Sequence, residues 1–283
     1  MTSIVRTTDP PATSRRGRPR SPARRRAPAW FARAGSLGWI VVGPALAALA
    51  WTLLVASGRF PDALLPGIPE ILGAAGDLQR EGLLAEDILA SLRRAAGGFV
   101  LGATAGIGAA IITATTTLGR RLLRPVLRLL APIPTIGLVP LAILWFGLGE
   151  GSKALVIALG VFVPVWINSH VGLASTPRDY LQAARCLGAG RAQTLREIVL
   201  PEAAPDIVAG LRVGAAMAFV LIVVAEMSGT TAGIGYRIYQ AQLFSQADRL
   251  IACLIVLGVL GALVDAIIAA TTTPITRWAA EEH

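Results

Sequence analysis

Polar and titratable side chains interrupt the apolar stretches of this sequence at only a few places. Asn168, Ser169 and His170 are consecutive at the end of one stretch, where they could line a solute pathway or take part in helix packing. Glu226 and Asp265 lie near opposite ends of two later stretches, and a carboxylate in hydrocarbon costs several kcal/mol unless it is paired. A proton relay needs two acids facing each other at mid-membrane. The pattern therefore favours interfacial or interhelical pairing over proton transfer.

Catalysis inside a membrane would require a nucleophile with its base, or a cluster of metal ligands. His170 with scattered serine and aspartate residues forms no such arrangement. The two cysteines, Cys186 and Cys253, lie in dissimilar contexts and predict no disulfide framework. We therefore expect no catalytic residue, no metal and no cofactor in this chain, and an intramembrane enzyme is disfavoured.

The composition is that of a membrane protein. Of the 283 residues, 54% are hydrophobic and 15% are charged, against roughly 25% charged in an ordinary soluble domain. A soluble domain of this length could not bury so much apolar surface, which excludes a soluble enzyme, a disordered tail protein and a fibrous repeat. Nine arginines precede Ser36, so most of the net charge of +9 belongs to an N-terminal arm and not to a nucleic-acid groove.

Several apolar segments are long enough to cross a bilayer core about 30 Å thick. The expected fold is all-α, a polytopic membrane protein with about six transmembrane helices and a cytosolic helical loop. We predict a disordered arginine-rich tail over residues 1–35, a membrane domain over 36–276 and a C-terminal tail over 277–283. The predicted spans are 39–57, 95–117, 129–148, 154–174, 205–227 and 250–273.

The distribution of basic residues predicts the orientation of these spans. With the N-terminus inside, 18 lysines and arginines fall in inner segments and 7 in outer segments. We therefore expect both termini in the cytoplasm of a cell whose plasma membrane holds the protein, with residues 176–201 at the cytosolic face. The arginine-rich tail would lie against the anionic leaflet as a topology signal, with a regulatory role as the alternative.

Two spans carry residues that affect helix packing. Gly98, Gly102 and Gly106 recur at every fourth position and form a ridge that lets another helix approach closely. That helix is expected within the same chain, with a subunit contact as the alternative. Pro132 and Pro134 must break the third span, because proline lacks a donor and forces the residue before it out of the helical conformation. Irregular backbone at membrane depth needs protein or water around it, so this span is expected to face a bundle interior or a pathway.

Residues 176–201 have the pattern of two short helices joined by a tight turn. Thr176 begins a capping-box-like pattern, and Pro177 fits the first helical position. Gly188 is expected to end the first helix in the left-handed conformation. The second helix is expected to stop at Pro201. We call this helix–turn–helix segment, residues 176–201, the knob. Exposed apolar groups on it indicate either a partner site or packing on the chain's own bundle.

This knob resembles the EAA loop of bacterial ABC importer permeases. The matching residues are Gln182-Ala183-Ala184, Gly188, and Ile198 to Leu200-Pro201, with glutamine where the family usually has glutamate. Other stretches resemble the nitrate, sulfonate and taurine branch of that family, so that the resemblance covers about residues 83–265. These stretches are Ser91–Arg94, Gly98–Gly102, Pro132–Gly147 and Ala225–Gly229.

The resemblance implies an ATP-driven importer whose permease passes a small solute. An organic anion such as a sulfonate or taurine, or nitrate, would be delivered by an extracytoplasmic solute-binding protein. Two permease copies, expected as a homodimer in the lipid bilayer, would work with two cytosolic ATPases. The chain has no Gly-x-x-x-x-Gly-Lys-Ser/Thr motif, so ATP and Mg would bind to the ATPase. The ATPase-coupling residues implied by the resemblance are Gln182, Ala183, Ala184, Leu187, Gly188, Ala189, Arg191, Ile198, Leu200 and Pro201.

A secondary transporter without an ATPase is the main alternative. It predicts inverted repeats with paired broken helices, and the sequence has one broken span with no counterpart. A purely structural membrane protein would leave the knob unexplained.

Overall fold

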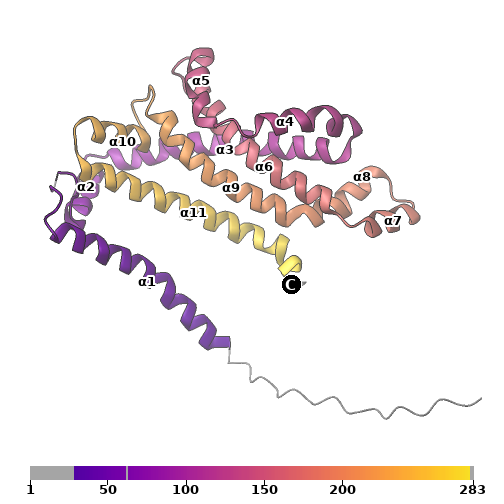
Figure 1. Ribbon diagram of the computed structural model, residues 1–283, viewed down its shortest axis with the longest axis horizontal. Coiled ribbons are helices and arrows are strands. Elements are labelled where there is room, and N and C mark those ends of the chain that lie inside the picture. Colours follow the sequence, from indigo (N-terminus) through magenta and orange to yellow (C-terminus); the bar gives the residue numbers. More distant parts are fainter. Residues whose placement is uncertain (1–28, 62, 281–283) are drawn as a thin grey trace, which may run out of the picture. The chain divides into compact units, whose positions relative to one another are not determined.

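The computed structural model describes residues 29–61 and 63–280, and these residues form helices and no strand (Figure 1). Most of the predicted 1–35 tail and the end of the predicted C-terminal tail lie outside the described residues. Contacts divide the chain after Trp51, so helix α1 (Ala29–Ala56) is described by itself. It is helical over the predicted first span up to Ala56. Its described apolar part, Val42–Ala56, is shorter than the 18 residues expected of a span.

Four helices in the described part of the chain are long and apolar enough to cross a membrane. They overlap four of the predicted spans. α6 packs against both α3 and α9, and α11 packs on the far side of α9 (Figure 1). The four are α3 (Leu83–Thr115), α6 (Glu150–Ser175), α9 (Leu200–Glu226) and α11 (Ala247–Ala280). The shorter elements between α6 and α9 and before α11 are α7 (Arg178–Cys186), α8 (Arg191–Thr194), η3 (Leu195–Val199) and α10 (Ile234–Leu243).

The segment before the second span is helical, although no helix was predicted there from the sequence. A short helix, α2 (Ile68–Arg80), buries one apolar face, and α3 begins at Leu83, well before the predicted start at Ala95. Asp87 and Arg94 lie in this added part of α3 and are hydrogen-bonded to other helices. Because paired charges are tolerated in a buried helix, α3 extends past the apolar stretch that hydropathy detects.

The predicted third span is broken, as its prolines require. Two arms meet at an angle of 89°, and Pro132 and Pro134 lie in the break between them. The first arm begins at Gly119, so the predicted start at residue 129 is wrong. In chain order the pieces are the π turn η1 (Gly119–Leu123), α4 (Arg124–Leu130), the 3-10 turn η2 (Thr135–Leu138) and α5 (Val139–Phe146).

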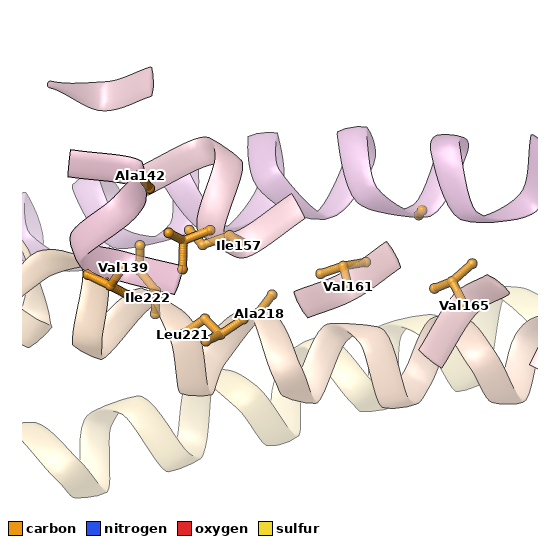
Figure 2. Packing of buried hydrophobic residues seen from close by; sticks show 10 residues of the cluster. Val139, Ala142, Ile157, Val161, Val165, Ala218, Leu221 and Ile222 are labelled. Carbon is orange, nitrogen blue, oxygen red and sulfur yellow. The ribbon is translucent and has the colours of Figure 1, made fainter. Parts of the chain in front are cut away.

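Most apolar side chains of this bent segment are exposed in a single copy of the chain. Leu129, Leu144 and Trp145 are 76%, 78% and 66% exposed. Val139 and Ala142 are its buried contacts with the core (Figure 2). Within one copy of the chain, the segment is therefore not enclosed by the bundle, and the alternative that it faces a pathway stays a prediction. Its outer face is left for lipid, for a pathway or for another subunit.

The main core lies where α6 meets α9. Val161 and Val165 of α6 are fully buried and pack in one cluster with Leu221 and Ile222 of α9 (Figure 2). Lipid chains are as apolar as these side chains, so close packing, more than removal from water, holds such helices together. Close packing of these helices therefore requires small residues at the positions where they touch.

Candidate functional site

The knob between α6 and α9 turns on a Schellman motif at the end of α7. The Ala189 N–H donates to the Ala184 carbonyl at 2.9 Å, and the Gly188 N–H donates to the Arg185 carbonyl at 3.0 Å. Gly188 has φ of +80°, which confirms the left-handed conformation predicted for it. Gly190 has φ of −71° and an extended backbone that other residues adopt equally well. Glycine is thus required at the first of these two positions only.

The capping box predicted at Thr176 is wrong. α7 begins at Arg178 with Pro177 as its N-cap residue, and no side chain caps the helix. The hydroxyl of Thr176 is buried and has no hydrogen-bond partner among the described residues. Only Thr176 and Pro177 separate α6 from α7, so Thr176 terminates α6 and its side chain turns into the protein.

The second helix of the knob does not stop at Pro201, in contrast to the prediction. α8, η3 and α9 form one continuous helix of 36 residues from Arg191 to Glu226. In the π turn before the proline, the Leu200 N–H donates to the Leu195 carbonyl, five residues back. The wider turn relieves the clash that a proline ring makes with the turn before it. A π turn followed by a proline also occurs where α4 begins.

One side of the knob packs on the bundle and another side is exposed. Leu181, Leu195 and Val199 pack in a cluster with Trp166 of α6. On the other side, Leu187 is 87% exposed and lies over a groove of about 540 Å³. The structure therefore supports both interpretations of the knob, because each applies to a different side. The groove is lined by Tyr180, Ala183, Ala184, Leu187, Glu197, Ile198, Pro201 and Glu202.

The remaining coupling residues implied by the resemblance lie around the same turn. Ala189 and Arg191 line a second cavity on another side of the knob. Gln182 is exposed, and Leu200 packs against the cluster under the knob. The structure thus brings all of them into one compact region at the end of the bundle.

The glycine ridge of α3 lies against α6 of the same chain. A Cβ atom on Gly102 would lie 2.8 Å from the Val161 Cβ and even closer to the carbonyl oxygen of Ala158. An added Cβ on Gly98 would lie 2.5 Å from the Ile157 Cβ, and one on Gly106 would lie 3.0 Å from the Phe162 carbonyl oxygen. Real Cβ atoms essentially never approach other atoms as closely as at Gly98 and Gly102, so glycine is what allows the two backbones to meet there.

Asn168 lies at the contact between α6 and α9. Its amide Nδ2 donates to the Pro164 carbonyl at 2.8 Å, and a Cβ on Gly210 would lie 2.9 Å from the Asn168 Cβ. Nearby on α6, His170 Nδ1 lies 2.9 Å from the hydroxyl of Thr113 on α3. These polar side chains are engaged in helix–helix contacts within the chain.

A buried charged network joins α3, α6, α9 and α10 at the end of the bundle opposite the knob. Glu226 is fully buried and accepts hydrogen bonds from Ser91 Oγ at 2.8 and 3.0 Å, from Arg94 at 2.8 Å and from the Gly235 N–H at 2.9 Å. Arg94 also donates to Glu150 at 2.8 Å. Satisfying a buried carboxylate in this way is what makes it tolerable at low dielectric.

A second buried carboxylate lies beside the first. Asp87 accepts a hydrogen bond from Arg237 Nε and another, at 2.7 Å, from the Gly233 N–H. Farther along the bundle, Asp265 of α11 makes a two-point ion pair with Arg212 of α9 at 2.7 Å for each bond. The predicted pairing of Glu226 and Asp265 with neighbouring helices is therefore confirmed.

Glu226 was predicted from the sequence as a paired carboxylate, but the residues that pair with it were not. Asp87, Ser91 and Arg94 follow one another at helical spacing and continue the face that Gly98 begins. Polar residues in line with a glycine ridge indicate a buried helix face. Extending that helix face toward the N-terminus of α3 would have identified Asp87, Ser91 and Arg94.

Replacing Glu226 with glutamine should lower the melting temperature of the purified protein. The change leaves Arg94 without its buried carboxylate, and breaking a buried pair costs about 3–5 kcal/mol. The control is Glu150→Gln, because the Glu150 side chain is 65% exposed and an exposed pair contributes about 1 kcal/mol or less. Equal shifts in the two variants, measured by thermal unfolding in detergent, would show that the network does not stabilise this end of the bundle.

Comparison with known proteins assigns the family. Residues 98–272 match the family described as binding-protein-dependent transport system inner membrane component. A candidate aliphatic sulfonates transport permease, SsuC of Bacillus subtilis (strain 168), is 33% identical over 243 residues, which are 85% of this chain and 88% of that protein. The taurine transport system permease TauC of Escherichia coli (strain K12) is 32% identical over 221 residues, 78% of this chain and 80% of that protein.

The fold is also that of a solved transporter. The structure resembles a chain of the methionine ABC transporter MetNI in an inward-facing conformation, with a TM-score of 0.55 and 18% identity, over 67% of this chain and 94% of that one. The all-helical structure of the described residues agrees with the family match, which covers more than half of the chain. This protein therefore belongs to the family of binding-protein-dependent inner membrane components, the membrane-spanning permease subunits of ABC importers.

Proposed function

We propose that this permease docks its ATPase on the knob and passes a small organic anion. The observation that carries the docking is the exposed groove beside Leu187, on a knob whose opposite side is packed on the bundle. ATP and Mg would bind to the separate ATPase chain, and an extracytoplasmic binding protein would deliver the solute. The relatives named for aliphatic sulfonates and taurine support a sulfonate as the solute.

The knob is built so that force at the groove reaches the membrane helices. Ala183 and Ala184 have small side chains, which lets a partner surface approach the α7 backbone closely. Leu181 and Val199 hold the same knob against the ends of α3 and α6. A partner that closes on the groove would therefore move the knob and the helices together, which is the shared two-state element that coupling requires.

A second copy of the permease is the proposed partner for the bent segment. The exposed apolar side chains of α5, among them Leu144 and Trp145, form a surface that the chain itself leaves uncovered. Large exposed apolar surfaces mark contacts with lipid or protein. Two copies facing each other across α5 would enclose a pathway with these residues near it.

Replacing Gly188 with valine should abolish ATPase retention and solute uptake while leaving the protein in the membrane. A β-branched side chain at φ of +80° is strained, so the turn that orients the groove would open. The control is Gly190→Ala, where the backbone is extended and nothing lies within 4 Å of an added Cβ. The measurements are co-purification of the ATPase and uptake of labelled taurine or an alkanesulfonate. Uptake driven by an ion gradient without any ATPase would instead favour a secondary transporter.

Cysteine labelling from outside the cell should test the proposed orientation, with both termini in the cytoplasm of the plasma membrane. In a cysteine-free background, Ala75→Cys should react with an impermeant reagent, and Gly17→Cys and Gly190→Cys should react only after the cells are opened. The expectation follows from the excess of basic residues in the inner segments. External labelling at position 190 would place the knob outside and remove the coupling role proposed for it.

A further inference from the structure

The second cavity at the knob is basic, and it lies outside the groove proposed for the ATPase, although Ala189 and Arg191 line it. It lies between α7, α8 and the end of α3 and has a volume of about 840 Å³. Arg120, Arg185 and Arg191 line it together with four threonines, and no carboxylate does. We name this cavity the arginine cleft. It lies on a different side of α7 from the groove, because Leu181 and Arg185 line the cleft while Tyr180 and Ala184 line the groove.

The three arginines of the cleft are unpaired. Within the part of the chain that the structure describes, Arg120, Arg185 and Arg191 make no hydrogen bond or ion pair through their side chains. In contrast, Arg94 and Arg237, at the other end of the bundle, each contact a buried carboxylate. Three guanidinium groups around one cavity repel one another unless an anion lies between them. The cleft therefore has a positive charge that the chain itself does not neutralise.

The shape around the cleft fits an anion that carries an apolar body. The cleft begins at Thr115, the last residue of α3, which is a helix long and apolar enough to cross a membrane. Beside it, Ile112, Leu118 and Leu122 are 47%, 70% and 62% exposed. A charged cavity at the end of a membrane-crossing helix, with apolar residues beside it, is the arrangement that a phospholipid requires.

We propose that the arginine cleft binds the phosphate of an anionic phospholipid from the leaflet on the knob side. Arg120 would hold the phosphate from η1, the turn that follows α3, and Arg185 and Arg191 would hold it from the two helices of the knob. Arginine is suited to this role because its planar fork donates two parallel hydrogen bonds to phosphate oxygens. The helix that starts at Arg191 adds the positive end of its dipole. A phosphate bound there fixes the corner of the knob to the end of α3.

Native mass spectrometry of the full-length chain, purified in detergent and titrated with phosphatidylglycerol, tests this proposal without any ATPase. The cleft variant is the triple change Arg120→Gln, Arg185→Gln and Arg191→Gln. The matched control is Arg121→Gln, Arg178→Gln and Arg196→Gln, which removes the same charge from exposed arginines of the same region outside the cleft. We expect the cleft variant to bind phosphatidylglycerol at least about tenfold more weakly and the control to bind as the unaltered chain does.

The other outcomes each overturn the assignment. Equal weakening in both triple variants would mean general attraction to basic surface and no site. Displacement of the lipid by millimolar inorganic phosphate would mean a site for a soluble anion. A cleft variant that binds lipid normally but no longer retains the ATPase would make the cleft part of the protein interface. If the triple variant does not fold, as judged by its melting curve, the single change Arg185→Gln is used, and we expect at least a threefold loss of lipid affinity.

Discussion

Replacing Gly102 with leucine should remove most of the folded permease from the membrane. At this position an added Cβ would meet the Ala158 backbone and the Val161 Cβ, and neither can move without shifting α6. Overpacking a core costs about 1–3 kcal/mol even where side chains give way, and here the contact is with backbone. The measurement is the yield of monodisperse protein after detergent extraction, together with solute uptake.

The same helix offers two matched controls for this substitution. Gly97 and Gly108 have nothing within 4 Å of an added Cβ, so Gly97→Leu and Gly108→Leu add the same side chain to α3 without a clash. We expect both to be recovered at close to the unaltered yield. Normal yield and uptake of the Gly102→Leu protein would show that α3 and α6 do not depend on the ridge for their contact.

Replacing Leu187 with aspartate should abolish co-purification of the ATPase while leaving the permease folded. Leu187 is 87% exposed and so contributes little to the chain's own packing. If the side chain is buried at the centre of the ATPase contact, its loss costs about 2 kcal/mol or more, a roughly thirtyfold weaker association. Retention of the ATPase on immobilised permease is the measurement, with the melting curve of the variant beside it.

The control for this change introduces the same charge one residue earlier. Cys186 is also exposed, but it does not line the groove, so Cys186→Asp should retain the ATPase. If both aspartates release the ATPase equally, added charge anywhere on α7 is sufficient, and the groove is not the docking surface. If neither does, the ATPase docks elsewhere and the proposed role of the knob is wrong.

Hydropathy predicted the long helices because each of them contains an uncharged apolar stretch. It misplaced the start of α3 because Asp87 and Arg94 are charged yet paired with residues distant in the chain, a contact that no local pattern contains. Proline rules predicted the break at Pro132 and Pro134 but failed at Pro201. The difference is the π turn before Pro201, in which the Leu200 N–H donates to the Leu195 carbonyl, and the sequence did not predict this turn.

At the candidate site, the sequence predicted the backbone conformation correctly where a single residue determines it. Gly188 was expected in the left-handed conformation and adopts it. The capping box at Thr176 failed because α6 and α7 are nearly contiguous, so tertiary packing decides where the hydroxyl lies. The arginine cleft could not be predicted, because Arg120 and Arg185 are brought together only when the end of α3 meets the knob.

The absence of a break at Pro201 gives the permease one continuous helical rod from the knob to the buried charged network, with Pro205 inside it. A helix of 36 residues is about 54 Å long, so that a tilt of about 10° at one end displaces the other by about 9 Å. One end of this rod begins at Arg191 in the knob, and the other ends at Glu226, which is held by Ser91 and Arg94. A small angular motion at the knob would therefore strain these hydrogen bonds at the opposite end of the bundle, because the helix between them is continuous.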